Sequence, residues 1–117
     1  MQHISAVTLA TQNMEHAVEF YEKLGFQLAY GGKNSEFSTL QDGEVVINLA
    51  ATQRYEGAWW GRVIFRVEDA DIFFQKLRSA GLSPEEPRDA PWGERFFHVA
   101  DPDGHELSFA QLLPSSS

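Results

Sequence analysis

The amino-acid sequence predicts an α+β fold in which two βαβββ repeats form a curved mixed sheet around a concave cleft. An internal repeat is the first observation: Ala6–Asn13 aligns with Arg62–Asp69, and the alignment continues without a gap to Gly25 and Gly81. The second observation is an amphipathic helix in each copy, and the third is a set of strand-like stretches after each helix. The chain has 117 residues, which suffice for one hydrophobic core, so we expect a single domain.

The first repeat opens with a strand in which Val7 and Leu9 alternate with small or polar residues, which directs them toward a helix. Asn13 is a suitable N-cap for that helix, because its side chain can accept a hydrogen bond from a free N–H group of the first turn. Gly25 suits the left-handed position after the last turn. Three strands are then expected, with an Asp-Gly hairpin turn before the last one: Phe26–Tyr30, Glu36–Leu40 and Glu44–Ala50.

The second repeat has the same order, with Val63 and Phe65 directed toward a helix that Asp69 caps and Gly81 ends. A short strand is expected near Leu82, and two longer ones follow at Glu94–Val99 and Glu106–Leu112, joined by a turn at Asp101–Gly104. We expect one domain over residues 1–113, with unit one at about 1–52, a linker at about 53–61, unit two at about 62–113 and a disordered tail at 114–117.

Composition excludes several classes of protein. The net charge of −8 leaves no surplus of Lys and Arg to neutralise phosphates, so we expect no nucleic-acid partner. The chain has no cysteine, which excludes disulfide scaffolds, thiolate metal sites and cysteine nucleophiles. It has neither a secretory signal pattern nor a long apolar segment, so we expect a cytoplasmic protein with no membrane partner.

Three stretches carry a resemblance to a known family: Asn13–Phe26 (NMEHAVEFYEKLGF), Val67–Leu82 and Ala90–Phe109 (APWGERFFHVADPDGHELSF). Together they resemble the vicinal-oxygen-chelate superfamily, also called the glyoxalase/bleomycin-resistance/dioxygenase family, over essentially the whole chain. The segment Pro91-Trp92-Gly93-x-Arg95 is most similar to the metal-free, bleomycin-resistance-like branch. The resemblance implies the two-repeat fold given above and a homodimer.

The resemblance also locates the positions at which the metal enzymes of the family place their ligands. These positions are Ala6, Arg62, Ser108, and either Ile47 or Asn48, depending on a strand register that the sequence leaves open. None of them is a histidine or a carboxylate, and alanine and arginine cannot coordinate a divalent ion. We therefore expect no family metal and no cofactor.

An unconventional metal site remains an alternative. His98 lies in a predicted strand and, with Glu106, is the best candidate pair for zinc or iron. The other histidines, His3, His16 and His105, are expected to lie at the surface or in ordinary hydrogen bonds.

Two arginines form the sharpest polar signal. Period-two alternation places Arg62 and Arg66 on the concave face, together with Ile64, Glu106, Ser108 and Ala110. Two arginines on one face could bind a carboxylate or phosphate. Alternatively, they pair with Glu106, Glu94 or Glu44, or lie at a subunit interface. Three further residues, Thr8, Asn48 and Ser108, could add neutral hydrogen bonds to a ligand.

Aromatic residues form the second signal. Trp59 and Trp60 lie in a glycine-flanked link, and we expect at least one of them in the core and one facing a pocket or a dimer interface. The family resemblance implies that Trp92 borders the pocket. Phe37 and Phe97 complete the predicted ligand-binding set, and no residue is assigned a catalytic role.

Three functions remain open from these residues. The first is a metal-independent protein that binds a small molecule and sequesters a drug or metabolite as a homodimer. The alternative is a metal-dependent lyase, isomerase or dioxygenase with an atypical metal site, and the third is a regulatory or scaffolding protein without a ligand. The overall acidity fits a cationic ligand, whereas Arg62 and Arg66 favour an anionic or polar one.

Overall fold

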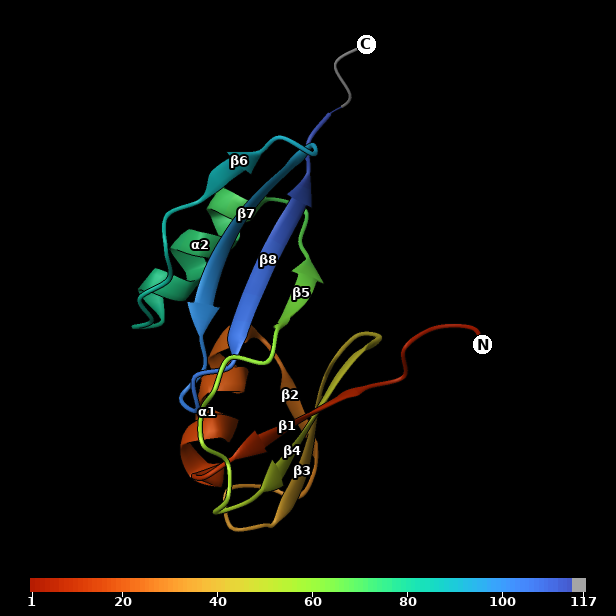
Figure 1. The fold of residues 1–117 in the computed structure, drawn as a ribbon, viewed down its shortest axis with the longest axis vertical. Helices are drawn as coiled ribbons and strands as arrows, with labels where there is room; N and C mark the ends of the chain where they lie inside the picture. The colour runs from red at the N-terminus through yellow and green to blue at the C-terminus, as the bar shows by residue number, and fades with distance from the viewer. Residues whose placement is uncertain (115–117) are drawn as a thin grey trace. The chain divides into compact units, whose positions relative to one another are not determined.

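The computed structural model describes residues 1–114, which form eight strands and two helices (Figure 1). In chain order they are β1 (Val7–Thr11), α1 (Met14–Leu24), β2 (Gln27–Tyr30), β3 (Phe37–Asp42), β4 (Val45–Ala51), β5 (Arg62–Arg66), α2 (Ala70–Ser79), β6 (Arg88–Ala90), β7 (Glu94–Ala100) and β8 (Glu106–Leu112). The chain divides into two compact units, Met1–Ala58 and a second unit that begins at Trp59. Residues 115–117 of the predicted tail lie outside the described residues.

Unit 1 is a four-stranded sheet with α1 packed against one face. The strand order is β1-β4-β3-β2, in which β1 runs parallel to β4 and the other neighbours are antiparallel. Leu9, Leu40 and Leu49 are buried under α1, next to Tyr21 of the helix. The apolar residues of β1 therefore face the helix, as the alternation predicts.

The ends of α1 confirm the predicted capping residues. The Asn13 side chain accepts a hydrogen bond of 3.0 Å from the backbone N–H of His16. Gly25 has a φ of +112°, a conformation that residues with a β-carbon rarely adopt. The N–H of Phe26 then donates to the carbonyl of Tyr21 at 3.1 Å, which closes the last turn.

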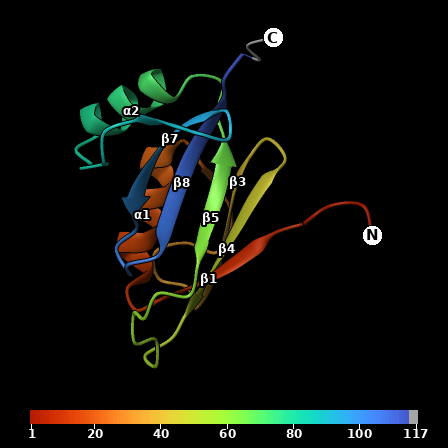
Figure 2. The ribbon, with the colours of Figure 1, turned by 45° about the horizontal axis from the view of Figure 1, so that its top comes forward.

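Unit 2 repeats this architecture. The strand order is β5-β8-β7-β6, with β5 parallel to β8, and α2 packs against β7 and β8 (Figure 2). Asp69 caps α2 by accepting a hydrogen bond of 3.0 Å from the N–H of Ile72. Under the helix, the rings of Phe73, Phe97 and Phe109 pack together. The α+β class and the two βαβββ units are confirmed. Each unit carries its own four-stranded sheet, and the concave cleft stays a prediction.

The short strand expected near Leu82 is wrong in position, because β6 begins only at Arg88. Pro84 and Pro87 explain the difference. Neither has an N–H group to donate to a strand ladder, so pairing with β7 is interrupted until the second proline has passed. Between them, the N–H of Glu85 donates a single hydrogen bond of 2.9 Å to the carbonyl of His98.

Strand pairing also closes the open register in β4. Thr8 of β1 lies opposite Asn48, and the matching residue of unit 2, Ile64, lies opposite Ser108. Asn48 is thus the counterpart of Ser108, whereas Ile47 is buried in the core of unit 1.

No helix among residues 1–114 is both long and apolar enough to cross a membrane.

Candidate functional site

A hollow of about 430 Å³ lies on the face of the unit 2 sheet opposite α2. Alternate residues of β5, β7 and β8 point into it, since successive side chains of a strand lie on opposite faces. Arg88 of β6 and Trp92 of the following turn add to its wall. The lining residues are Arg62, Ile64, Arg88, Trp92, Glu94, Phe96, His98, Ser108 and Ala110.

The floor of the hollow is polar, and its polar side chains are already hydrogen-bonded to each other. Ser108 is only 3% exposed, and its hydroxyl is hydrogen-bonded to Nδ1 of His98 on the neighbouring strand. Burial is the main cause that lowers the pKa of His98, although the nearby Glu106 carboxylate acts in the opposite direction. His98 is therefore neutral at neutral pH and brings a hydrogen-bonding group, without a charge, to the site.

One wall of the hollow is aromatic. The ring planes of Trp92 and Phe96 are tilted by 23°, with centroids 6.0 Å apart. Trp92 is 68% exposed, and its indole N–H donates a hydrogen bond of 2.6 Å to Glu94. The guanidinium of Arg88 also lies over Phe96, 4.9 Å from the ring centroid. These groups form an aromatic wall in which Trp92 is exposed and Phe96 half-buried, and aromatic ligands stack on walls of this kind.

The two predicted concave-face arginines are both paired with glutamates. Nε of Arg62 lies 2.6 Å from Glu106, directly opposite it in the β5–β8 ladder. The hydrogen bond from Arg62 is the main reason that the pKa of Glu106 is lowered. Arg66 lies 3.1 Å from Glu94. The sequence left open whether these arginines pair with glutamates across the sheet. The structure shows this pairing, with Glu106 and Glu94 as the partners.

Trp59 and Trp60 lie at the surface, 70% and 48% exposed, so the expectation that one of them fills the core is wrong. Polar partners explain their position. The indole N–H of Trp59 donates to Glu106 at 3.2 Å, and that of Trp60 donates to His105 at 2.8 Å. Since both N–H groups find acceptors, one on the first residue of β8 and one in the turn before it, neither indole has to be buried. Neither residue lines the hollow.

Phe97 is a second correction. It is 1% exposed and packs against Phe73, Phe74 and Phe109 in the core beneath α2. Its neighbour Phe96 lies on the opposite face and lines the hollow, because side chains alternate along β7. Phe96 therefore replaces Phe97 in the candidate set.

The unit 1 candidates form a polar row on the sheet face opposite α1. The hydroxyl of Thr39 donates to the side-chain oxygen of Asn48 at 2.7 Å, and the amide of Asn48 donates to Thr8 at 3.3 Å. Thr39 and Asn48 are register partners, as are His98 and Ser108 in unit 2. Phe37, two residues before Thr39 in β3, is exposed. These residues offer hydrogen bonds and one aromatic edge, without a charge.

The residues at the family ligand positions do not fit a divalent metal. Arg62 is a cation and Ala6 has no donor atom, which leaves only the neutral side chains of Asn48 and Ser108. Glu106, the carboxylate of the alternative site, is already bound by Arg62 and Trp59, while His98 is bonded to Ser108. Within residues 1–114, no group of three or more histidine and acidic side chains is arranged to hold a metal.

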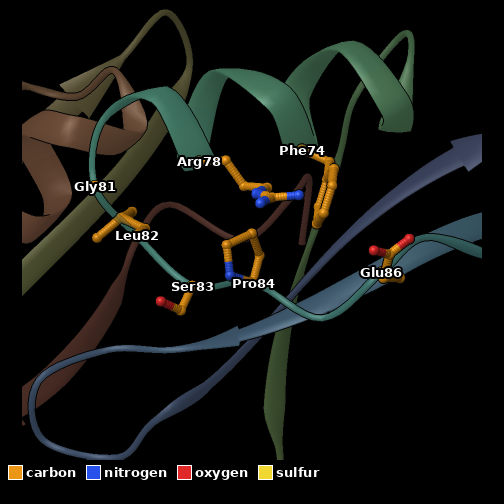
Figure 3. A pocket seen from close by; sticks show the side chains of 7 residues that line it. All are labelled: Phe74, Arg78, Gly81, Leu82, Ser83, Pro84 and Glu86. Atoms are coloured by element: carbon orange, nitrogen blue, oxygen red, sulfur yellow. The ribbon is translucent and has the colours of Figure 1, made fainter.

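A second hollow of about 430 Å³ lies at the end of α2, between the helix and the loop that follows it (Figure 3). The side chain of Arg78 extends there toward Phe74, with its guanidinium 5.7 Å from the ring centroid. Phe74 is buried and belongs to the core. This hollow therefore has no exposed aromatic surface and is the weaker candidate.

Comparison with known proteins gives the family. The model of the Glyoxalase/Bleomycin resistance protein/Dioxygenase superfamily matches residues 3–109. The chain belongs to this superfamily. A curated member, a bleomycin resistance protein of Klebsiella pneumoniae, is 28% identical over 112 residues, covering 88% of this chain and 87% of the relative. The resemblance inferred from the sequence is thus confirmed.

Several solved structures share the fold. A bleomycin resistance determinant encoded on the transposon Tn5 has a TM-score of 0.83 at 22% identity, covering 95% of this chain and 98% of its own. A bleomycin-binding protein complexed with bleomycin has a TM-score of 0.81 at 23% identity, covering 94% of this chain and 98% of its own. An integron cassette protein from a Halifax Harbour sewage outfall has a TM-score of 0.80 at 26% identity, covering 96% of this chain and 100% of its own.

Arg88 and Phe96 are among the residues of this superfamily member's hollow that sequence reasoning did not name as ligand-binding candidates. Alternation along β7 was a sufficient signal for Phe96, since it shares a strand face with His98. Arg88 had no such signal, because its position depends on where the proline-interrupted loop joins the sheet.

Proposed function

We propose that this protein binds a flat or aromatic small molecule without the help of a metal and sequesters it, as bleomycin-resistance proteins do with a drug. The observation that carries the proposal is the aromatic wall of exposed Trp92 and half-buried Phe96 beside a hollow with a buried polar floor. Membership in the superfamily and the named relatives support it. A homodimer is part of the same proposal.

The hollow offers binding groups rather than a catalytic set. The hydrogen-bonded pair of Ser108 and His98 has the form of a nucleophile and its base. Ser108, however, is buried in the central part of β8, where it pairs with β5 and β7 on both sides. Backbone N–H groups in such a ladder are already bonded and cannot form an oxyanion hole. We therefore interpret the pair as a rigid, polar floor.

A metal-dependent lyase, isomerase or dioxygenase is the competing function. Elemental analysis of the purified protein separates the two. Stoichiometric zinc, nickel, manganese or iron that is lost on chelation, together with loss of ligand binding, would contradict the proposal. A protein that binds its ligand equally well before and after chelation supports it.

Tryptophan fluorescence tests binding directly, because Trp92 lies in the hollow and the other two tryptophans do not. Titration with bleomycin and with uncharged planar aromatics is expected to quench the emission. Trp92→Phe should remove most of the quenching, while the matched control Trp59→Phe should retain it. Quenching that persists fully in Trp92→Phe would place the ligand elsewhere, and no response to any aromatic would reject the proposal.

A further inference from the structure

The charges around the unit 2 hollow do not cancel. Arg62 is balanced by Glu106, and Glu94, the acidic residue of the lining, is balanced by Arg66. His98 contributes no charge at neutral pH. Arg88 remains, and no carboxylate of residues 1–114 lies within ion-pair distance of its guanidinium. The residues that line the hollow, counted with their ion-pair partners, thus carry one net positive charge.

The position of Arg88 is set by the strand pairing. Arg88 and Phe96 are register partners in the β6–β7 ladder, so their side chains lie side by side on the same sheet face. This pairing holds the guanidinium 4.9 Å from the Phe96 ring centroid. A phenylalanine ring has no oxygen or nitrogen acceptor, so a guanidinium beside it can still donate its N–H groups to a ligand.

We infer that the hollow takes a planar aromatic ligand that carries one anionic group, with its ring on the Trp92–Phe96 wall and its anion on the N–H edge of Arg88. This inference rests on the proposed function and specifies the ligand class. The protein's overall charge of −8 points the other way, but long-range repulsion is screened by salt, whereas the contact with Arg88 is local. A carboxylate or phosphate can accept two hydrogen bonds from one guanidinium.

Three probes of nearly identical shape test the charge: naphthalene-2-carboxylate, naphthalene-2-carboxamide and naphthalene-2-carboxamidine. Calorimetric titration of the full chain is expected to show the carboxylate binding about tenfold more tightly than the carboxamide, as one charged hydrogen-bonded contact predicts. The carboxamidine is expected to bind most weakly, since Arg88 repels it. The preference for the carboxylate should shrink as sodium chloride is added.

Arg88→Gln should remove the preference by weakening carboxylate binding far more than carboxamide binding, while Arg88→Lys should retain part of the preference. Arg78→Gln is the matched control. Arg78 also lies over a phenylalanine ring but borders the other hollow (Figure 3), so its loss should change nothing. If Arg78→Gln removed the preference and Arg88→Gln did not, the anion would be bound at the end of α2 and the inference would be wrong.

The failures of the two proposals are distinguishable. If all three probes bound equally and Phe96→Ala weakened each of them, the aromatic site would stand and the anion assignment would fall. If none of the probes bound to the wild type, both the proposed site and the inference about its ligand would be rejected.

Discussion

The indole N–H of Trp60 donates a hydrogen bond of 2.8 Å to Nδ1 of His105. His105 is buried in the turn before β8, and the two rings meet edge to face with centroids 5.7 Å apart. Nδ1 accepts this hydrogen bond, so the tautomer that makes it has its ring proton on Nε2. The contact joins the first residues of unit 2 to the β7–β8 turn, where Asp101 accepts hydrogen bonds from the backbone N–H groups of Asp103 and His105. Asp101 is thus a turn residue, as predicted.

We predict that Trp60 and His105 stabilise the fold as a pair. A double-mutant cycle of Trp60→Phe and His105→Phe, measured by urea unfolding, should give a coupling free energy of about 1 kcal/mol, the usual value of one hydrogen bond. The matched cycle of Trp59→Phe with His105→Phe should give a coupling near zero, since Trp59 donates to Glu106. Equal coupling in both cycles would contradict the assigned bond.

Arg95 should stabilise unit 2 in a pH-dependent way. Its guanidinium contacts both carboxylate oxygens of Asp71 at 2.8 and 3.0 Å and Asp89 at 2.9 Å, which joins β7 to the start of α2 and to β6. The hydrogen bond from Arg95 is the main reason that the pKa of Asp71 is lowered. A carboxyl group with a lowered folded-state pKa stabilises the fold above its unfolded-state pKa, and this stabilisation is lost as pH falls through the folded-state value.

The stability difference between the wild type and Arg95→Gln should therefore be larger at about pH 7 than at about pH 2, because the contribution of Asp71 is lost as pH falls. Arg78→Gln, an arginine without an ion pair among residues 1–114, is the control and should show no such pH dependence. A constant difference for Arg95→Gln across this range would rule out the ion pair as the cause.

His98 should make the fold more stable as the solution becomes less acidic. Burial lowers its pKa in the folded state, so the unfolded chain takes up the proton first as pH falls. The stabilisation is complete above the ordinary histidine pKa and is lost as pH falls through the lower folded-state value. His98→Gln, which can still bond to Ser108, should reduce this pH dependence.

The measurement is the free energy of unfolding at about pH 7.5 and about pH 5 for wild type and variant, since histidine titrates between them. His16→Gln, at an exposed position on α1, is the matched control and should behave as the wild type. An unchanged pH dependence in His98→Gln would show that another group is responsible.

Adjacent residues of β7 should have separable roles. Phe97→Ala should lower the free energy of unfolding by about 3–5 kcal/mol, because it leaves a cavity in the core under α2. Phe96→Ala should change stability far less and should instead weaken binding of aromatic ligands. Urea unfolding measures the stability of both variants, and calorimetric titration measures their ligand binding. Phe97→Leu replaces Phe97→Ala in these measurements if Phe97→Ala does not fold. A large loss of stability in Phe96→Ala would contradict the assignment of Phe97 to the core face of β7 and of Phe96 to the face of the hollow.

Local features were predictable from the residues alone. The capping roles of Asn13 and Asp69 and the left-handed glycine at Gly25 act within one turn of a helix, so the nearby sequence contains all the groups involved. The strand near Leu82 was misplaced although its cause, the prolines at 84 and 87, is visible in the sequence. Proline shows where a ladder is interrupted, but the residue at which pairing resumes depends on the partner strand.

The repeat, the α+β class, the superfamily and the apolar faces of the helices were thus determined by the sequence itself, because they depend on period, capping and composition. The tertiary structure alone decided that Glu106 and Glu94 pair with Arg62 and Arg66, and that Arg88 lies over Phe96. These contacts join residues far apart in the chain. A shift of one residue in strand register would move every side chain of the strand to the other face of the sheet and break them. Charge balance in the hollow is therefore a property of the assembled sheet.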